Sequence, residues 1–203
     1  MIFYWFVKGI FYPFVRLYLG FRREGLVHVP RKGPLIIVSN HVSYIDAILL
    51  GSAAPRPVHF MVLQWMYDLL FLRWFYWGMG TVPVQSDGKD RKAIRRALQV
   101  LDRGRVLGIF PEGTRSPDGR VRETRPGAAM IAALSGAPVV PAFIDGARES
   151  MPVGARFPAP ARVHVRFGPA LLYRRDETKR DRNGMREFAQ SMEDAIRRLG
   201  EGA

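Results

Sequence analysis

The chain has 203 residues, and 31 Lys or Arg against 18 Asp or Glu give it a formal charge of +13, an excess that attracts polyanions. A hydrophobic share of 48% is ordinary for one folded domain and argues against wholesale disorder. Because there is no cysteine, disulfides, thiolate metal ligands and a cysteine nucleophile are excluded.

The N-terminal stretch MIFYWFVKGIFYPFVRLYLGFRR is crowded with aromatic residues but is interrupted by Lys8, Pro13 and Arg16. A spanning helix needs about 20 mostly apolar residues, and a secretory leader has its basic residues first. Aromatic rings mixed with cations are typical of the lipid headgroup region. Residues 1–25 are therefore predicted to be a helical segment at the membrane interface, peripheral or monotopic. A buried N-terminal helix of a soluble protein is the alternative, because periodicity does not separate a core face from a lipid face.

Apolar runs and turn residues then predict alternating strands and helices. Strands are predicted at 35–39, 58–62, 81–84, 105–110, 139–144 and 161–167. Helices are predicted from 46 to about 50, over 65–80, 90–103 and 127–138, and around 185–199. This alternation predicts an α/β fold over residues 26–203, with a mostly parallel central sheet flanked by helices.

The stretch SNHVSYIDA places His41 just after the predicted strand at 35–39 and five residues before Asp46. Imidazole suits general base work, and a carboxylate bonded to one ring nitrogen leaves the other free to take a proton. With no Cys and no Gly-x-Ser-x-Gly elbow, this pair predicts a base that activates a hydroxyl of the substrate itself. A capping aspartate beside a satisfied strand-end histidine is the alternative. A metal site is not indicated, since no paired ligand spacing is present.

A second polar stretch, GIFPEGTRS, follows the predicted strand at 105–110. Gly113 allows backbone N–H groups to approach an anion, Thr114 offers a hydroxyl, and Arg115 carries a fork of donors suited to phosphate. Glu112 fits an anion site only if it bonds Arg115 or a substrate hydroxyl. Ligands bind beyond the carboxyl ends of parallel strands, so both stretches are expected at one edge of the sheet. A turn carrying a solvated charge pair is the alternative.

Together, NHVSYID and FPEGTRS resemble the Asn-His-x4-Asp and Phe-Pro-Glu-Gly-Thr-Arg-Ser motifs of the 1-acylglycerol-3-phosphate acyltransferases, a glycerolipid acyltransferase family. VVPAFIDG resembles that family's downstream Val-Pro-Val/Ala segment, and the likeness runs from about residue 26 to 199. The resemblance implies His41 as general base, Asp46 as its partner, and substrate-binding roles for these residues: Asn40, Glu112, Gly113, Thr114 and Arg115.

The resemblance also implies the reaction and its surroundings. The expected donor is acyl-CoA or acyl-carrier protein, with no further cofactor, and the expected acceptor is a lysophospholipid, first of all lysophosphatidic acid in phospholipid biosynthesis. The expected location is the cytoplasmic face of the cell membrane.

One block departs from the family pattern, which has a basic residue after a Gly and an aliphatic stretch. In GMGTVPVQSDGKD, Gln85 and Ser86 stand where that residue is expected. Lys89 or Arg91 is a candidate substitute. Otherwise the acceptor has a different head group, as in lysophosphatidylethanolamine or a lyso-ornithine lipid.

The alternative to an enzyme is a non-catalytic basic protein that binds lipid or nucleic acid. RNA binding predicts aromatic and basic residues interleaved on an exposed strand. Here the aromatics crowd into two helix-like apolar segments. A membrane bilayer is therefore the expected partner, and nucleic acid is not.

Overall fold

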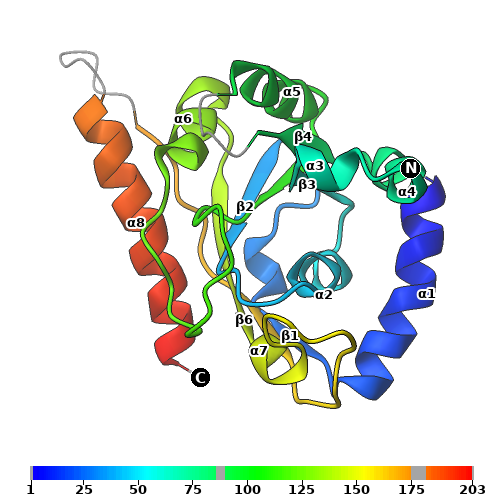
Figure 1. Cartoon of the computed structure of the whole chain (residues 1–203). Coiled ribbons are helices and arrows are strands. Elements are labelled where there is room, and N and C mark those ends of the chain that lie inside the picture. The colour runs from blue at the N-terminus through cyan, green and yellow to red at the C-terminus, as the bar shows by residue number, and fades with distance from the viewer. Residues whose placement is uncertain (1, 86–89, 175–181, 203) are drawn as a thin grey trace.

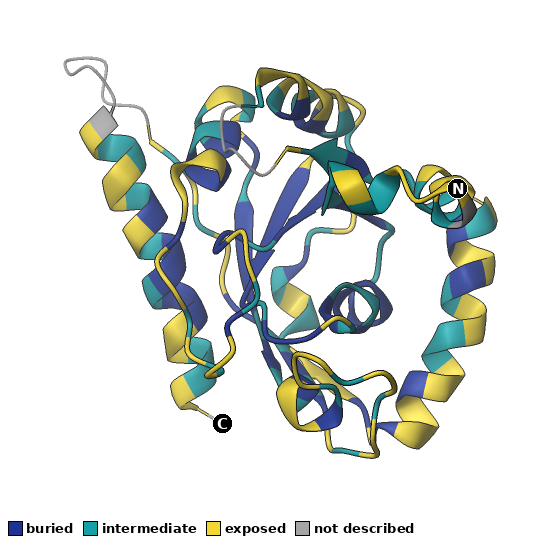
Figure 2. Cartoon of the chain, viewed as in Figure 1, coloured by how far each residue is buried: buried dark blue, intermediate teal, exposed yellow. Residues whose placement is uncertain are grey.

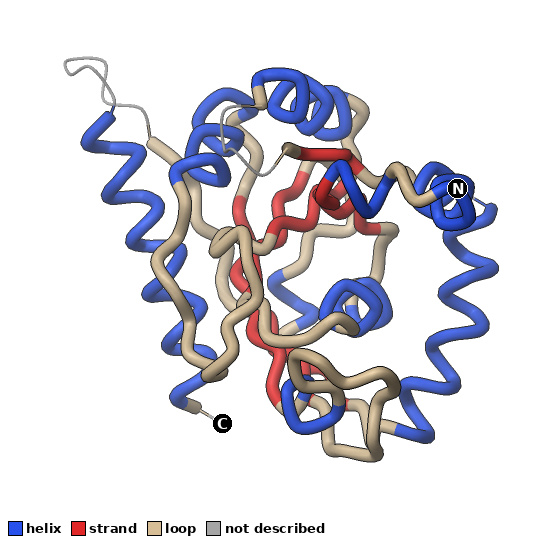
Figure 3. The backbone as a smooth tube through the Cα atoms, viewed as in Figure 1, coloured by secondary structure: helices blue, strands red, loops and turns tan. Residues whose placement is uncertain are grey.

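The computed structural model describes residues 2–85, 90–174 and 182–202, in which helices and strands alternate along the chain (Figure 1 and Figure 3). The strands are β1 (Arg22–Glu24), β2 (Leu35–Ser39), β3 (Val58–Leu63), β4 (Val82–Val84), β5 (Val106–Ile109), β6 (Val139–Asp145) and β7 (His164–Phe167). The helices are α1 (Ile2–Tyr18), α2 (Asp46–Ala53), α3 (Gln64–Tyr67), α4 (Leu70–Met79), α5 (Arg91–Asp102), α6 (Pro126–Ser135), α7 (Ala147–Ser150) and α8 (Arg182–Glu201), with a 3-10 turn at Leu26–His28.

The described strands form one seven-stranded sheet in the order β1-β7-β6-β2-β5-β3-β4. Every neighbouring pair is parallel except β6 and β7, which are antiparallel. The prediction of a mostly parallel sheet flanked by helices is therefore confirmed. The central strands β2 and β5 lie side by side, with Leu35 opposite Val106 and Val38 opposite Ile109.

The core lies on both faces of the sheet because successive side chains of a strand point to opposite sides. In β2, Leu35 and Ile37 belong to the core under α1 and α2, whereas Ile36 and Val38 belong to the core under α5, α6 and α8. These helices form a layer on each side of the buried strands (Figure 1 and Figure 2). A strand buried on both faces reads as a continuous aliphatic run, as LIIV does here.

Helix α1 packs one face on the domain and exposes the other. Tyr4 and Val15 are buried, whereas Phe6 and Leu17 are 64% and 85% exposed. Lys8 donates to the carbonyl of Ala54 at the end of α2, and Arg23 donates to the carbonyl of Ala53 at 3.0 Å. Both cations therefore meet the carbonyl end of α2, where positive charge is favourable.

Four segments differ from the sequence prediction. The helix predicted over 65–80 is interrupted, because Leu69 is extended and separates α3 from α4. The side chain of Gln64, at the start of the short α3, donates to the carboxylate of Asp68, which follows its last residue. Aspartate is a weak helix former in helix interiors, which favours the end of α3 at this point. The strand predicted over 161–167 begins at His164, and the short elements β1 and α7 were not predicted.

No helix in the described ranges combines the length and the apolarity that crossing a bilayer requires.

Candidate active site

The two polar stretches meet at one edge of the sheet, beyond the carboxyl ends of β2 and β5. Residues 40–45 connect β2 to α2, and the long loop 110–125 connects β5 to α6. Because β2 and β5 are parallel neighbours, both connections leave the sheet at the same end. The sequence expectation that these stretches share an edge is confirmed.

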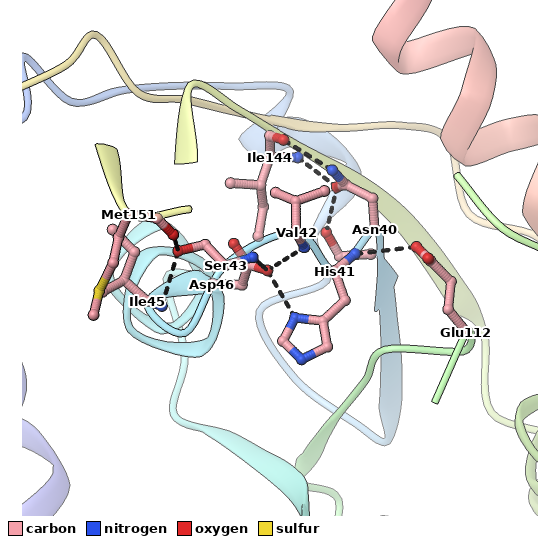
Figure 4. Close-up of polar contacts among 10 residues, drawn as sticks. Asn40, His41, Val42, Ser43, Ile45, Asp46, Glu112, Ile144 and Met151 are labelled. Atoms are coloured by element: carbon pink, nitrogen blue, oxygen red, sulfur yellow. Dashed lines mark hydrogen bonds and ion pairs between the residues drawn. The ribbon is translucent and has the colours of Figure 1, made fainter. Parts of the chain in front are cut away.

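His41 and Asp46 form a direct pair. Nδ1 of His41 lies 2.7 Å from Oδ2 of Asp46, whose side chain is fully buried (Figure 4). Since an ionised carboxylate only accepts hydrogen bonds, the Nδ1 proton points to Asp46 and Nε2 keeps its lone pair. The His41 side chain is 22% exposed, so a small ligand can reach the ring. This is the arrangement that general base catalysis requires.

The turn between β2 and α2 is built around the same carboxylate oxygen. Oδ2 of Asp46 also accepts the backbone N–H groups of Val42 at 2.7 Å and Ser43 at 2.8 Å (Figure 4). The hydroxyl of Ser43 donates to the carbonyl of Met151 at 2.7 Å and ties the turn to the segment after α7. Asp46 therefore fixes both the orientation of the His41 ring and the conformation of the turn that carries it.

The loop after β5 holds the peptide of His41 from both sides. Oε1 of Glu112 accepts the His41 N–H at 3.1 Å, and the N–H of Ser116 donates to the His41 carbonyl at 2.7 Å. Glu112 is buried and does not bond Arg115, although the two are three residues apart. Its role in this geometry is to position the backbone of the histidine.

Burial raises the pKa of Glu112 from its ordinary 4.5 to about 7. The neighbouring negative charge of Asp46 adds to the rise, while the His41 N–H and the backbone and charge of Arg122 oppose it. Oε2 of Glu112 is buried without a hydrogen-bond partner among the described residues. Below about pH 7, burial therefore favours the protonated form of Glu112.

Phe110 supports the imidazole from one side. The rings of His41 and Phe110 are stacked with centroids 4.2 Å apart and planes 16° apart, and Phe60 continues the stack at 5.9 Å from Phe110. The flat contact restricts rotation of the imidazole and leaves its edge open. Phe110 was not singled out from the sequence, although it is the first residue of FPEGTRS.

Asn40 links β2 to β6. Its Nδ2 donates to the carbonyl of Ile144 at 2.9 Å and its Oδ1 accepts the Ile144 N–H at 2.8 Å (Figure 4). The buried amide thus imitates one more backbone pair of the sheet and directs the chain into the His41 turn.

The remaining residues of the motif are nearer the surface. Gly113 has φ +71°, a backbone conformation in which a side chain is strained, and a Cβ there would lie 2.7 Å from Nε of Arg125. The Gly113 N–H donates to the Phe110 carbonyl at 3.0 Å. Thr114 is exposed, and the guanidinium carbon of Arg115 lies 3.5 Å from the ring centroid of Tyr44.

Helix α8 supports the far end of loop 110–125, and the two run close together in Figure 1. The buried Glu193 accepts the N–H of Thr124 at 2.9 Å and pairs with Arg197 at 2.7 Å. Arg197 also donates to the carbonyl of Val121 at 3.2 Å. The sequence offered no signal for this contact beyond an acidic residue within the apolar stripe of the helix.

The structure describes only part of residues 78–90, the block that differs from the family pattern. Gln85 is exposed, and its N–H donates to Asp90 at 3.1 Å. Ser86 and Lys89 lie outside the described residues, and Arg91 is exposed at the first position of α5. Within the described ranges, no group of three His, Asp or Glu side chains is placed to hold a metal ion.

The chain is similar in sequence and in fold to several known proteins. The family model described as Acyltransferase matches residues 20–145, more than half of the chain. A chloroplastic 1-acyl-sn-glycerol-3-phosphate acyltransferase of Arabidopsis thaliana is 33% identical over 71% of this chain and 40% of that protein. A lyso-ornithine lipid O-acyltransferase of Pseudomonas aeruginosa is 35% identical over 61% of this chain and 47% of that protein.

The chain thus spans about half the length of these curated relatives. Among solved structures, the 1-acyl-sn-glycerophosphate acyltransferase PlsC of Thermotoga maritima superposes with a TM-score of 0.78. The match covers 98% of this chain and 80% of that one at 24% identity, and it shows that the two share a fold.

Proposed function

Because the chain belongs to the Acyltransferase family, we propose that it moves a fatty acyl group from acyl-CoA or acyl-carrier protein to the free hydroxyl of a lysophospholipid. Lysophosphatidic acid, which would become phosphatidic acid in phospholipid biosynthesis, is the first candidate acceptor. The observation that carries the proposal is the 2.7 Å pair of His41 and Asp46, held beside Arg115 by the loop after β5.

The chemistry follows from the free ring nitrogen of His41. Nε2 takes the proton of the acceptor hydroxyl while the oxygen attacks the thioester carbonyl carbon, so no acyl-enzyme is formed. The tetrahedral intermediate then collapses, the carbon–sulfur bond breaks, and the imidazolium returns the proton to the leaving thiolate. General base catalysis of this kind contributes about 10²- to 10⁴-fold.

Asp46 and the surrounding turn make this proton transfer favourable. The carboxylate stabilises the imidazolium and keeps the tautomer with Nε2 free. Phe110 and the two hydrogen bonds to the His41 peptide hold the ring in place, so little reorganisation is needed. Because the N–H of Gly113 already bonds the Phe110 carbonyl, we assign it no contact with the developing oxyanion.

Arg115 is the proposed contact for the acceptor head group, since a guanidinium fork matches the oxyanions of a phosphate. Glu112 and Asn40 are proposed as positioning residues, because the structure directs their polar atoms to the protein backbone. Gly113 and Thr114, which are exposed in the same loop, are proposed to lie against the bound substrate.

A lyso-ornithine lipid is the second candidate acceptor. Two observations favour it: the 35% identity to an enzyme named for that acceptor, and Gln85 at a position where the family pattern has a basic residue. Both candidates use the same base and the same donor chemistry.

We also propose that the enzyme works at a membrane surface, on its cytoplasmic face. Large apolar side chains are exposed on α1 and α4, including Phe6 at 64%, Leu70 at 86% and Trp77 at 76%. Phe3 of α1 packs edge-on against Trp74 of α4 with centroids 5.8 Å apart, so the two helices are joined. Such a joined apolar surface, on a chain with a formal charge of +13, suits an anionic bilayer.

The test of the function is thiol release from acyl-CoA and from acyl-carrier protein across a panel of lysolipids. We expect release only when an acceptor with a free hydroxyl is present, together with formation of the diacyl product. Lysophosphatidic acid and lyso-ornithine lipid separate the two candidates. Thiol release that ignores every acceptor, or none with any, would overturn the proposal.

A further inference from the structure

Tyr44, the third residue after His41, makes a contact that the proposed chemistry does not yet use. The guanidinium carbon of Arg115 lies 3.5 Å from the centroid of the Tyr44 ring, close enough for face-to-face stacking. Tyr44 is 48% exposed, so its ring is not part of the hydrophobic core.

The guanidinium of Arg115 has an unsatisfied donor. Nη1 is buried and has no hydrogen-bond acceptor among the described residues. Arg56, in contrast, donates to the carbonyls of Pro30, Gly33 and Gly104, and Arg23 donates to that of Ala53. Among the described residues, the Arg115 guanidinium is thus contacted on its face by Tyr44, while Nη1 in its N–H edge has no acceptor, and an oxyanion that enters at this edge would satisfy it.

The contact lies next to the catalytic base. His41 and Tyr44 belong to the same short turn, whose backbone is fixed by the Asp46 carboxylate. Arg115 precedes Ser116, whose N–H donates to the His41 carbonyl at 2.7 Å. A head group held by Arg115 is thereby kept at a set distance from Nε2 of His41.

Stacking matters because an exposed arginine has many rotamers. A free guanidinium must lose that freedom when it binds an anion, whereas a stacked one has already lost it. Two carboxylates lie three residues from Arg115 in the chain. That of Glu112 accepts the His41 N–H and that of Asp118 accepts the Ser116 hydroxyl, so neither bonds Arg115.

We propose that Tyr44 is a positioning residue for the acceptor: its ring holds the Arg115 guanidinium flat, with the N–H edge turned to the anionic head group of the lysolipid. The inference rests on the proposed function and adds a residue that tunes acceptor affinity. Tyr44 acts through Arg115 and does not itself take part in proton transfer.

The test compares three variants by steady-state kinetics, varying acceptor and donor separately. Tyr44→Leu keeps an apolar side chain but removes the π face, and we expect the acceptor KM to rise about three- to tenfold, with a smaller change in kcat. Tyr44→Phe keeps the face and is expected to restore the acceptor KM. Phe157→Leu, the same kind of change at a side chain that is 83% exposed, is the control.

A double variant tests whether the effect passes through Arg115. In an Arg115→Ala background, Tyr44→Leu is expected to change the acceptor KM no further. Glycerol 3-phosphate as a competing anion should lose affinity in parallel with the acceptor in the single variants.

The inference is overturned if Tyr44→Leu leaves the acceptor KM unaltered, or if Tyr44→Leu raises the KM equally in the Arg115→Ala background. In either case, acyl transfer by the wild type leaves the proposed function standing. If the wild type transfers no acyl group to any acceptor, the proposed function itself has failed. Circular dichroism and the thermal midpoint of each variant establish that the comparison is made between folded proteins.

Discussion

At the scale of single residues, one carboxylate organises the site. Oδ2 of Asp46 accepts from the His41 ring and from two backbone N–H groups of the same turn. One group therefore orients both the His41 ring and the turn that carries it.

Replacing Asp46 with Asn tests this arrangement. An amide that keeps accepting from the backbone favours the wrong histidine tautomer, so we expect kcat to fall about 10²- to 10⁴-fold with a modest loss of stability. Single-turnover rates and thermal unfolding measure the two effects separately. A variant with near wild-type kcat would show that the carboxylate only shapes the turn.

The raised pKa of Glu112 predicts that the stability of the protein depends on pH. Its folded pKa of about 7 lies above the ordinary 4.5, so the folded state binds the extra proton between these values. This proton uptake adds to the free energy of unfolding. The added stability is fully present below pH 4.5 and is lost as the pH rises through 7, a loss of up to about 3 kcal/mol. Glu112→Gln keeps an acceptor for the His41 N–H but cannot titrate.

The measurement is urea unfolding of wild type and Glu112→Gln between pH 5 and about pH 8. We expect the wild type to lose unfolding free energy relative to the variant as the pH rises. Other titrating groups cancel in the difference, so parallel curves would contradict the raised pKa.

At the scale of elements, the sequence predicted what local patterns determine. The run Leu35–Ser39 is aliphatic because β2 is buried on both faces, and α5 has the amphipathic period with Asp90 as its N-cap. β1 was missed because Arg-Arg-Glu carries no strand pattern and pairs with β7, far along the chain. The break at Leu69 was missed because the hydrophobic pattern continues through it.

The contacts of the candidate site also fall into those that a local pattern predicts and those that it does not. The spacing of His41 and Asp46 predicted a bond that a strand end and a tight turn allow. The partner of Glu112 and the Tyr44–Arg115 stack depend on how two loops face each other, which no local pattern contains.

Helix α4 carries a prediction about membrane binding. Trp77 is 76% exposed on α4, whereas Leu134 is 61% exposed on α6, on the other face of the sheet. Trp77→Glu is expected to weaken binding to anionic vesicles about tenfold, because a buried aromatic contact with lipid is lost.

Leu134→Glu makes the same change of charge and is the matched control, with near wild-type binding expected. Co-sedimentation at constant salt measures both variants. Equal losses in the two would mean that charge alone governs attachment.

At the scale of the whole molecule, the C-terminal helix reaches the active-site loop. Glu193 of α8 is buried and accepts the Thr124 N–H, which lies at the end of the loop that carries Glu112 and Arg115. The loop that bonds the His41 backbone is thus anchored at its far end by α8.

Glu193→Ala is expected to lower the unfolding free energy by about 1–3 kcal/mol, because it leaves a buried N–H without an acceptor. It should also lower kcat/KM for the acceptor, since the loop is less restrained. Glu187→Ala, at an exposed position of the same helix, is the control. Stability and kinetics equal to this control would remove α8 from the support of the site.

The central claim is that Nε2 of His41 removes the proton of the acceptor hydroxyl. The most direct test is the single-turnover rate of acyl transfer by His41→Ala, measured with saturating donor and the best acceptor of the panel. We predict a loss of about 10³-fold or more, with folding and vesicle binding retained. Acyl transfer by this variant at a rate near that of the wild type would contradict the account.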